Sequence, residues 1–290
     1  MKLTDLLNKL IEQNAKDDIY AIEDIVNNIK KIYPKESAYV NSILDVIENK
    51  RAKLFSLIML TCTLREVYLN KVQTNRVFKM FSSSFYEDSL KEYLIKILAY
   101  QPIDKYPHIV NSLYLMFKNE TSIEKKILLA EVLINTKNRA KEVSSWLYKF
   151  AIDNTLPDTL EDINTLALKT ECCEVLALNK KYLDSAKNGI FYLIKECKFL
   201  KITDERQWGI IKSSFYKIDI EKKDISYILK LAKDKSLISY HRIKILSLLE
   251  KVPLDADIVN ELDSMLLLKD EEFEDFNLEL KKLVLKIKSS

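Results

Sequence analysis

The sequence predicts a nearly all-α fold, and its glycine content is the strongest reason. The chain of 290 residues contains two glycines, Gly189 and Gly209, where about 7% of residues would be usual. Glycine supplies the positive φ angles that tight β-hairpin turns require. The five prolines and the many leucine, isoleucine, lysine and glutamate residues also favour helices. We therefore expect helices joined by short polar links, with at most an incidental strand.

Apolar residues recur at helical spacing from one end of the chain to the other. The first helix is predicted by the stripe Leu3, Leu6, Leu7 and Leu10, and the last by Phe273, Phe276, Leu280, Leu283, Val284 and Ile287. About fifteen helices are expected, separated by breaks near residues 15–17, 33–36, 49–51, 70–75, 82–85, 100–107, 118–121, 135–138, 154–158, 179–181, 199–203, 217–222, 235–239, 251–254 and 268–270. The prolines all fall at these breaks, where a missing amide proton costs little.

Three helix starts carry the spacing of a capping box. In this motif a polar side chain accepts from the backbone amide three residues on, and an acidic side chain there reaches back. The pairs with this spacing are Ser84 with Glu87, Thr121 with Glu124, and Asp158 with Glu161. They predict helices that begin just after residues 84, 121 and 158.

Short links predict antiparallel helix hairpins that stack side by side over residues 1–290 as one continuous domain. A pair of about 35–40 residues is typical of HEAT or armadillo-type α-solenoids, which form right-handed superhelices. Residues 1–14 and 270–288 are then capping helices with one wet face, whereas the uncharged run Leu54 to Leu64 fits an interior helix. The segments share no repeat consensus, so a compact multi-helix domain stays open as an alternative.

The four cysteines, Cys62, Cys172, Cys173 and Cys197, are expected to be small core residues rather than a metal or redox site. Cys172 and Cys173 lie within a broad apolar surface of one helix. In an antiparallel pair, Cys197 would lie about 15 Å from the level of Cys173. Zinc ligands must all lie about 2.3 Å from one point. We expect no metal and no cofactor.

Catalytic signatures are missing from the sequence. Walker loops, dinucleotide-binding fingerprints and nucleophile elbows each need at least two glycines close together in the sequence. The two glycines of this chain are isolated from each other, so these motifs are excluded. The two histidines, His108 and His241, lie far apart, and both fall at expected helix starts, where we expect surface or capping positions. Carboxylate pairs at helix starts are explained by the helix dipole. The chain is therefore not expected to be an enzyme.

Candidate partner-binding residues lie in two neighbouring segments. Arg206, Trp208 and Lys212 surround Gly209, which could allow another backbone to approach, and tryptophan and arginine are enriched in binding hot spots. His241 and Arg242 complete the set of candidates. The favoured alternative for Trp208 is that it packs against Ile211, Phe215 and the preceding helix. Trp146 is expected in the core.

Charge is segregated toward the C-terminal half. From Lys180 to Lys251 there are 17 Lys or Arg against 9 Asp or Glu, and from Leu254 to Glu279 there are 10 acidic residues against one lysine. These neighbouring regions could attract each other or could present one basic and one acidic surface. Aromatic residues interleave with the lysines, a pattern that permits nucleic-acid binding.

A reducing cytoplasm is the expected compartment. The N-terminus carries Lys2, Asp5 and Lys9 instead of an apolar signal core, and four cysteines do not form a secreted disulfide framework. The longest uncharged run is far shorter than the roughly 20 residues that span a bilayer.

The sequence therefore favours a non-catalytic scaffold that recognises a protein partner. The alternative is a nucleic-acid-binding array that uses residues 180–251. An enzyme whose acidic residues act in a cleft, for example on a nucleobase, is held in reserve.

Overall fold

The computed structural model describes residues 3–15, 18–32, 37–153, 163–196, 205–266 and 274–289. Within these ranges the chain forms sixteen α-helices and no β-strand, which confirms the all-α prediction. The helices are α1 (Leu3–Ala15), α2 (Ile19–Ile32), α3 (Ser37–Glu48), α4 (Leu54–Thr63), α5 (Lys71–Ser82), α6 (Asp88–Ala99), α7 (Pro107–Asn119), α8 (Ile123–Leu133), α9 (Ala140–Ala151), α10 (Ile163–Ala177), α11 (Leu183–Glu196), α12 (Glu205–Phe215), α13 (Lys222–Ala232), α14 (Ser239–Ser247), α15 (Ala256–Leu266) and α16 (Glu274–Ser289). Short 3-10 segments include η1 (Ile103–Lys105), η2 (Lys180–Tyr182) and η4 (Leu248–Lys251).

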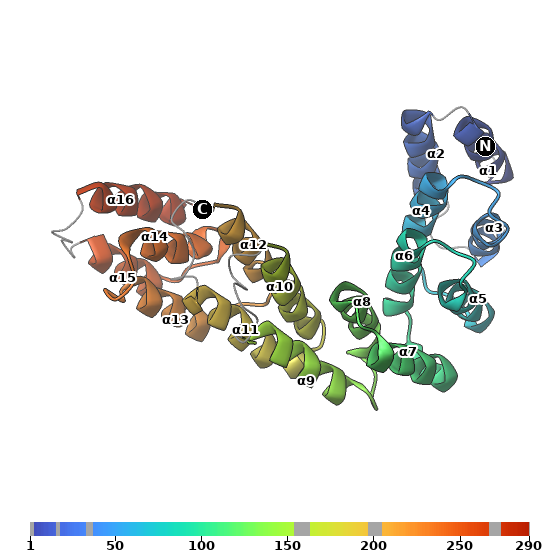
Figure 1. The fold of residues 1–290 in the computed structure, drawn as a ribbon. Helices are drawn as coiled ribbons and strands as arrows, with labels where there is room; N and C mark the ends of the chain where they lie inside the picture. The colour runs from blue at the N-terminus through green and yellow to red at the C-terminus, as the bar shows by residue number, and fades with distance from the viewer. Residues whose placement is uncertain are drawn as a thin grey trace. The chain divides into compact units, whose positions relative to one another are not determined.

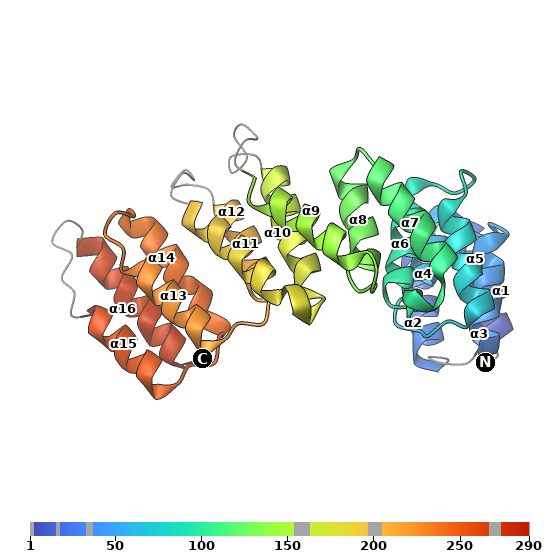
Figure 2. The ribbon, with the colours of Figure 1, turned by 90° about the horizontal axis from the view of Figure 1, so that it is seen from below.

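The chain divides into two compact units, Met1–Val143 and Ser144–Ser290, and the division falls within α9. In unit 1 the helices pack as consecutive pairs: α1 with α2, α3 with α4, α5 with α6, and α7 with α8. Each even-numbered helix also packs against the next even-numbered one, and α3 packs against both α1 and α5. The helices of this unit therefore lie in two rows (Figures 1 and 2). Successive pairs begin 34 to 36 residues apart, at residues 3, 37, 71 and 107.

Unit 2 repeats this pattern of pairs. Helix α10 packs against α11 and α12, α13 packs against α14 and α15, and α16 packs against α14 and α15 (Figure 1). Helices α11 and α13 also meet through the rings of Phe191 and Tyr227, whose centroids are 5.0 Å apart. Aromatic side chains of the basic segment thus contribute to packing between helices.

The core of each unit lies along the seam between its helices. Leu60 on α4 and Leu98 on α6 are fully buried in unit 1, as are Leu176 and Ile190 in unit 2. Helix α4, which the uncharged run 54–64 predicts as an interior helix, packs against α2, α3 and α6, and Phe55 on it is 39% exposed. This helix is apolar all round and still keeps one face partly open to solvent.

Helix caps account for the observed starts of α5 and α8. Helix α5 begins within the expected break at 70–75, because Asn70 and Gln73 form a capping box. Helix α6 begins at Asp88 with Glu87 as its N-cap, so the predicted Ser84–Glu87 box is wrong. The cap of α8 is Ser122, one residue beyond the predicted Thr121. The predicted Asp158–Glu161 box lies outside the described residues.

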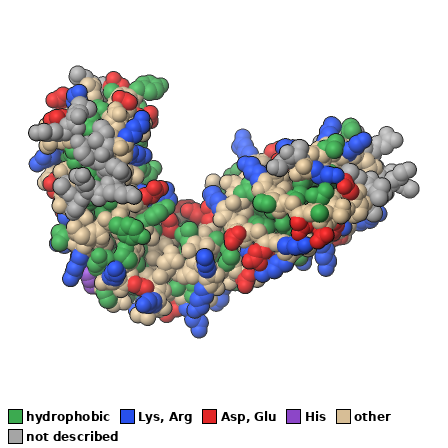
Figure 3. Space-filling model, turned by 180° about the vertical axis from the view of Figure 1, so that it is seen from behind, with side chains coloured by type: hydrophobic (Ala, Val, Ile, Leu, Met, Phe, Trp, Pro, Cys, Tyr) green, Lys and Arg blue, Asp and Glu red, His purple; other side chains and the backbone are tan. Residues whose placement is uncertain are grey.

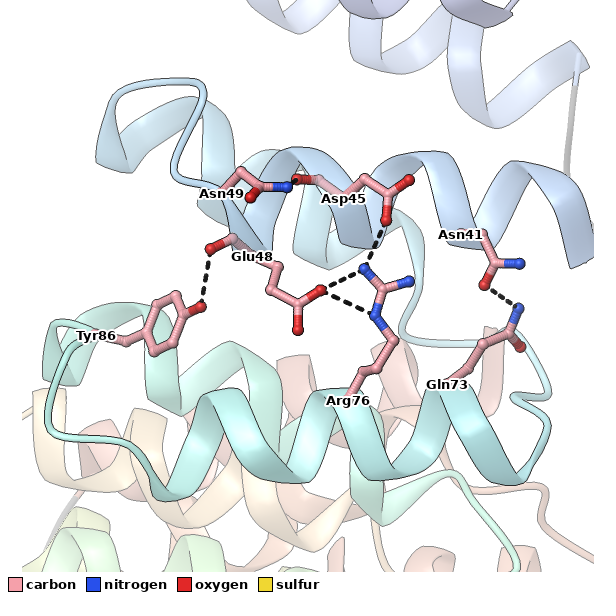
Figure 4. Close-up of polar contacts among 7 residues, drawn as sticks. All are labelled: Asn41, Asp45, Glu48, Asn49, Gln73, Arg76 and Tyr86. Atoms are coloured by element: carbon pink, nitrogen blue, oxygen red, sulfur yellow. Dashed lines mark hydrogen bonds and ion pairs between the residues drawn. The ribbon is translucent and has the colours of Figure 1, made fainter.

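Polar side chains join residues that are about one helix pair apart in the sequence. Between α3 and α5, Arg76 Nη2 lies 2.7 Å from Asp45 Oδ1, and Arg76 Nε donates to Glu48 Oε2 at 3.0 Å (Figure 4). Gln73 Nε2 donates to Asn41 Oδ1 at 2.9 Å. These partners are separated by 28 to 32 residues. The contacts therefore fix one helix pair against the next.

The two glycines lie inside helices but have different surroundings. A Cβ at Gly189 on α11 would lie 2.7 Å from Cys173 Sγ on α10 and 3.6 Å from Ala151 Cβ on α9. Gly189 therefore permits a close approach of α11 to its neighbours. Gly209 on α12 is exposed, and a Cβ there would meet nothing within 4 Å. No backbone among the described residues approaches Gly209 closely, so the space beside it is open to a partner.

Alanine at these two positions should change stability in opposite directions. Gly209→Ala should raise the free energy of unfolding by about 0.5–1 kcal/mol, because alanine restricts the unfolded chain and favours the helix. Gly189→Ala should lower it by about 1–3 kcal/mol through overpacking. Denaturant titration measures both changes. In a Cys173→Ala background the same Gly189 substitution should become stabilising. Equal stabilisation by both substitutions in the wild-type background would contradict this packing.

Over the described ranges, no helix is both long enough and apolar enough to cross a membrane.

Candidate functional site

The five residues predicted to contact a partner do not form one accessible cluster. Arg206 on α12 is exposed. Lys212, on the same helix, is partly exposed and its Nζ lies 3.3 Å from Glu250 Oε1. The other three residues, Trp208, His241 and Arg242, are buried. A partner at the folded surface could therefore reach the first two side chains only.

The three buried candidates hold α12, α13 and α14 together. The ring of Trp208 lies 6.1 Å from that of His241, and both residues are at most 4% exposed. Arg242 Nε donates to the backbone oxygen of Ala232 at 2.9 Å. The favoured expectation that Trp208 packs inside is confirmed, although its ring partner is on the following pair. The expected surface or capping position of His241 is wrong, and Trp146 is half-buried rather than core.

His108 fits its predicted place. It lies exposed in the first turn of α7, and its Nε2 is 2.8 Å from Asn75 Oδ1 on α5. This contact joins two successive helix pairs.

Cys172 and Cys173 are core residues, as predicted. Both are fully buried on α10. Burial raises the pKa of Cys173 to about 12 and raises that of Cys172 well above its usual value. The thiolate is the nucleophile and the metal ligand, so neither thiol is prepared for such chemistry. Cys197 lies outside the described residues, among which no three His, Cys, Asp or Glu side chains are grouped to hold a metal ion.

Thiol labelling should separate these cysteines. Cys62 is partly exposed, and burial raises its pKa above the usual value. Iodoacetamide at about pH 8 should therefore modify Cys62 slowly in the native protein and should modify Cys172 and Cys173 only after unfolding. Peptide mass spectrometry with and without denaturant measures the order. Native modification of Cys173 at the rate of an unfolded thiol would contradict the core assignment.

Seven lysines of residues 180–251 form ion pairs in the part of the chain that the structure describes. Lys222 lies 2.8 Å from Asp255 and 2.9 Å from Asp257, and Lys233 lies 2.6 Å from Glu261. The basic and acidic regions of the sequence thus attract each other directly. Others of this segment that pair with carboxylates are Lys187, Lys212, Lys217, Lys223 and Lys244. On the face that Figure 3 shows, basic and acidic side chains are interspersed.

A pocket of about 500 Å³ in unit 1 brings together residues that the sequence did not nominate. Its lining comes from α2, α3, α4, α6 and the turn after α4, and comprises Lys30, Tyr39, Thr61, Cys62, Thr63, Arg65, Glu66, Val67, Tyr93 and Lys96. The three cations on its wall, Lys30, Arg65 and Lys96, form no ion pair within the described parts of the chain. We call this the Cys62 pocket.

The three cations all act on the Cys62 thiol. Burial raises the pKa of Cys62, and the positive charges of Lys30, Arg65 and Lys96 oppose that rise. Burial also raises the pKa of Glu131 on α8, against the opposing charges of Lys96 and Arg65. The positive side chains of the pocket wall therefore come from α2, the turn after α4 and α6, and two of them also act on Glu131 of α8.

Two further pockets carry charges that are already paired. One of about 240 Å³ lies among α5, α6, α7 and α8, where Lys125 Nζ is 2.8 Å from Asp88 Oδ2. Another, of about 390 Å³, lies beside η4 and α16, where Lys288 pairs with Asp263 and Glu250 pairs with Lys286. The Cys62 pocket differs from both because its three cations form no ion pair with a described carboxylate, although Lys96 and Arg65 lie near enough to Glu131 to act on its charge.

The spacing of the three cations is the one sequence signal that could have indicated this pocket. Lys30, Arg65 and Lys96 follow one another at intervals of about one helix pair, in or just after α2, α4 and α6. Recognising them requires the stacking register of the pairs, which apolar periodicity alone does not supply.

No protein-family model matches the chain, and no curated protein matches it by sequence. Among solved structures, the comparison found an engineered protein whose crystal structure comes from the Northeast Structural Genomics Consortium. Its chain is 12% identical in sequence to this one. The comparison covers 98% of this chain and 89% of that chain, with a TM-score of 0.28. A TM-score this low does not indicate a shared fold.

Proposed function

We propose that this chain is a non-catalytic scaffold, an α-solenoid of HEAT or armadillo type that binds a protein partner through its helical surface. The observation that carries the proposal is the recurrence of contacts between residues about one helix pair apart. Asn41 with Gln73, Asn75 with His108, and Lys222 with Asp257 are separated by 32 to 35 residues. Such regular links are expected where each repeat is stabilised by its neighbours.

Stacked pairs supply a large surface that is ordered before a partner arrives. Association with such a surface avoids much of the entropy cost of ordering flexible segments. The exposed positions of successive helices can also vary without disturbing the buried seams. In this proposal the array is right-handed, with α1 and α16 as its capping helices.

Buried potential nucleophiles and bases support a binding role over a catalytic one. Cys172, Cys173 and His241 pack between helices, where a substrate has no access to them. The nucleic-acid alternative stays a prediction, and the internal pairing of lysines in 180–251 leaves fewer cations for phosphates. The protein-partner proposal draws instead on the available cations of unit 1.

Affinity capture with the full chain, followed by reconstitution with the captured protein, tests this function. We expect a stoichiometric complex whose cross-links involve at least three successive helices of one unit. The proposal would be wrong if no protein binds while nucleic acid binds tightly. In that case the affinity should fall steeply with salt and should vanish when lysines of 180–251 are reversed to glutamate.

A further inference from the structure

The Cys62 pocket combines three available cations with one carboxylate on its wall. Lys30 and Arg65 are exposed and Lys96 is partly exposed, whereas Glu66 is the one acidic residue among the ten that line the pocket. Arg65 lies over the ring of Tyr100 at 5.5 Å, and Lys96 lies over that of Tyr93 at 5.6 Å. Their contacts with protein are thus to rings, which leaves the guanidinium and ammonium groups able to take an anion.

The helix dipole explains why two of these cations lie at the C-terminal ends of helices, but it does not explain why three cations surround one pocket. Lys30 and Lys96 lie in the last turns of α2 and α6, where a cation offsets the negative end of the helix dipole. Lys79 and Lys118 occupy the same place on α5 and α7, yet they are not on the pocket wall. Dipole compensation therefore does not require three cations around one pocket.

Exposed tyrosines flank the pocket. Tyr68 is 82% exposed and Tyr100 is 47% exposed. Gln101 holds the two chain segments together, because its Nε2 donates to Val67 O at 3.0 Å and its Oε1 accepts from Leu69 N at 2.8 Å. Tyrosine and arginine are enriched among residues that dominate binding energy.

We propose that the Cys62 pocket binds an acidic segment of a protein partner, with carboxylates held by Lys30, Arg65 and Lys96 and apolar atoms covered by Tyr68 and Tyr100. This inference rests on the proposed scaffold function and names the chemistry of its partner. A carboxylate accepts charge-assisted hydrogen bonds from arginine and lysine. A nucleic acid would call for a longer track of cations along its phosphates, whereas three cations around one pocket match a few carboxylates.

A fluorescein-labelled octaglutamate peptide tests the pocket by fluorescence anisotropy with the full chain at low salt. We expect binding that weakens by about tenfold or more, or about 1.4 kcal/mol, in the triple variant Lys30→Glu, Arg65→Glu, Lys96→Glu. Each single pocket substitution should also weaken binding, whereas the control Lys79→Glu, which makes the same charge change as one of them on an exposed lysine away from the pocket, should leave binding unchanged. If the triple variant does not fold, the single glutamine variants at the three positions replace it.

Two further measurements tie the effect to the pocket. Glu66→Gln should tighten octaglutamate binding, because it removes the negative charge on the wall. Octaglutamate should also slow the alkylation of Cys62 in the wild-type protein. Equal weakening by Lys79→Glu, or no change in either measurement, would overturn the pocket proposal.

Further comparisons identify the class of ligand and separate the pocket proposal from the scaffold proposal. Tighter binding of octadeoxythymidylate than of octaglutamate, lost in the same pocket variants, would assign the pocket to nucleic acid and overturn the acidic-segment proposal. If a captured protein binds the triple variant as well as the wild type, the pocket proposal fails while the scaffold function stands. If no protein binds at all, the scaffold function itself fails.

Discussion

Replacing Asp224 with alanine should lower the free energy of unfolding of unit 2 by about 3–5 kcal/mol. The side chains of Asp224 and Lys187 are 7% and 3% exposed, and Lys187 Nζ lies 2.8 Å from Asp224 Oδ2. Removing Asp224 leaves the buried Lys187 ammonium with one weaker partner, Glu221, whose Oε1 lies 3.6 Å away and whose side chain is 51% exposed. Asp224 Oδ2 also accepts from the backbone amide of Glu221 at 2.8 Å, in the capping box of α13. The substitution therefore removes both the closest ion pair between α11 and α13 and a helix cap.

Tryptophan fluorescence during denaturation measures this effect, because Trp146 and Trp208 both belong to unit 2. Lys223→Ala, one residue away and exposed, should change stability little and serves as the control. The double variant Lys187→Met, Asp224→Leu should recover much of the lost stability, since neither charge remains buried. A single variant as stable as the wild type would show that the pair does not hold these helices.

Gln101→Leu should destabilise unit 1 by about 2–4 kcal/mol. Gln101 is 6% exposed and bonds the backbone groups of Val67 and Leu69, 34 and 32 residues earlier. Leucine has a similar size but leaves a buried carbonyl and a buried amide without partners, and each such group costs about 1–3 kcal/mol. The same change should weaken octaglutamate binding, because the turn that carries Arg65 and Tyr68 loses its attachment to α6.

Hydrogen exchange of the unit 1 amides measures the stability change locally. Gln13→Leu on α1 is the control, since Gln13 is half-buried and makes no hydrogen bond to the described residues. A loss of protection equal to that in Gln13→Leu would contradict the bridging role of Gln101.

Features that depend on neighbours in the sequence were predictable. The apolar stripes located the helices, and the two adjacent cysteines within a broad apolar surface indicated their burial. Boundaries were less certain because adjacent Thr121 and Ser122 offer equivalent caps to α8, and the asparagine–glutamine box at Asn70 is less familiar than one that uses an acidic residue.

Features that depend on stacking were not predictable from local patterns. His241 and Arg242 are polar residues whose burial is made possible by Trp208 and by the backbone of Ala232. Trp208 lies on α12 and Ala232 on α13, whereas His241 and Arg242 lie on α14, so the spacing of residues within one helix does not reveal these contacts. The Cys62 pocket also depends on stacking. Lys30, Arg65 and Lys96 line one pocket only because α2, α4 and α6 pack side by side.

Lysine acetylation footprinting of the full chain, with and without the captured partner protein, tests the central claim most directly. If the even-numbered helices of unit 1 bind an acidic segment of that protein, Lys30 and Lys96 should be protected in the complex while Lys79 reacts as in the free chain. Unchanged acetylation of Lys30 and Lys96, with protection confined to lysines of 180–251, would contradict the claim.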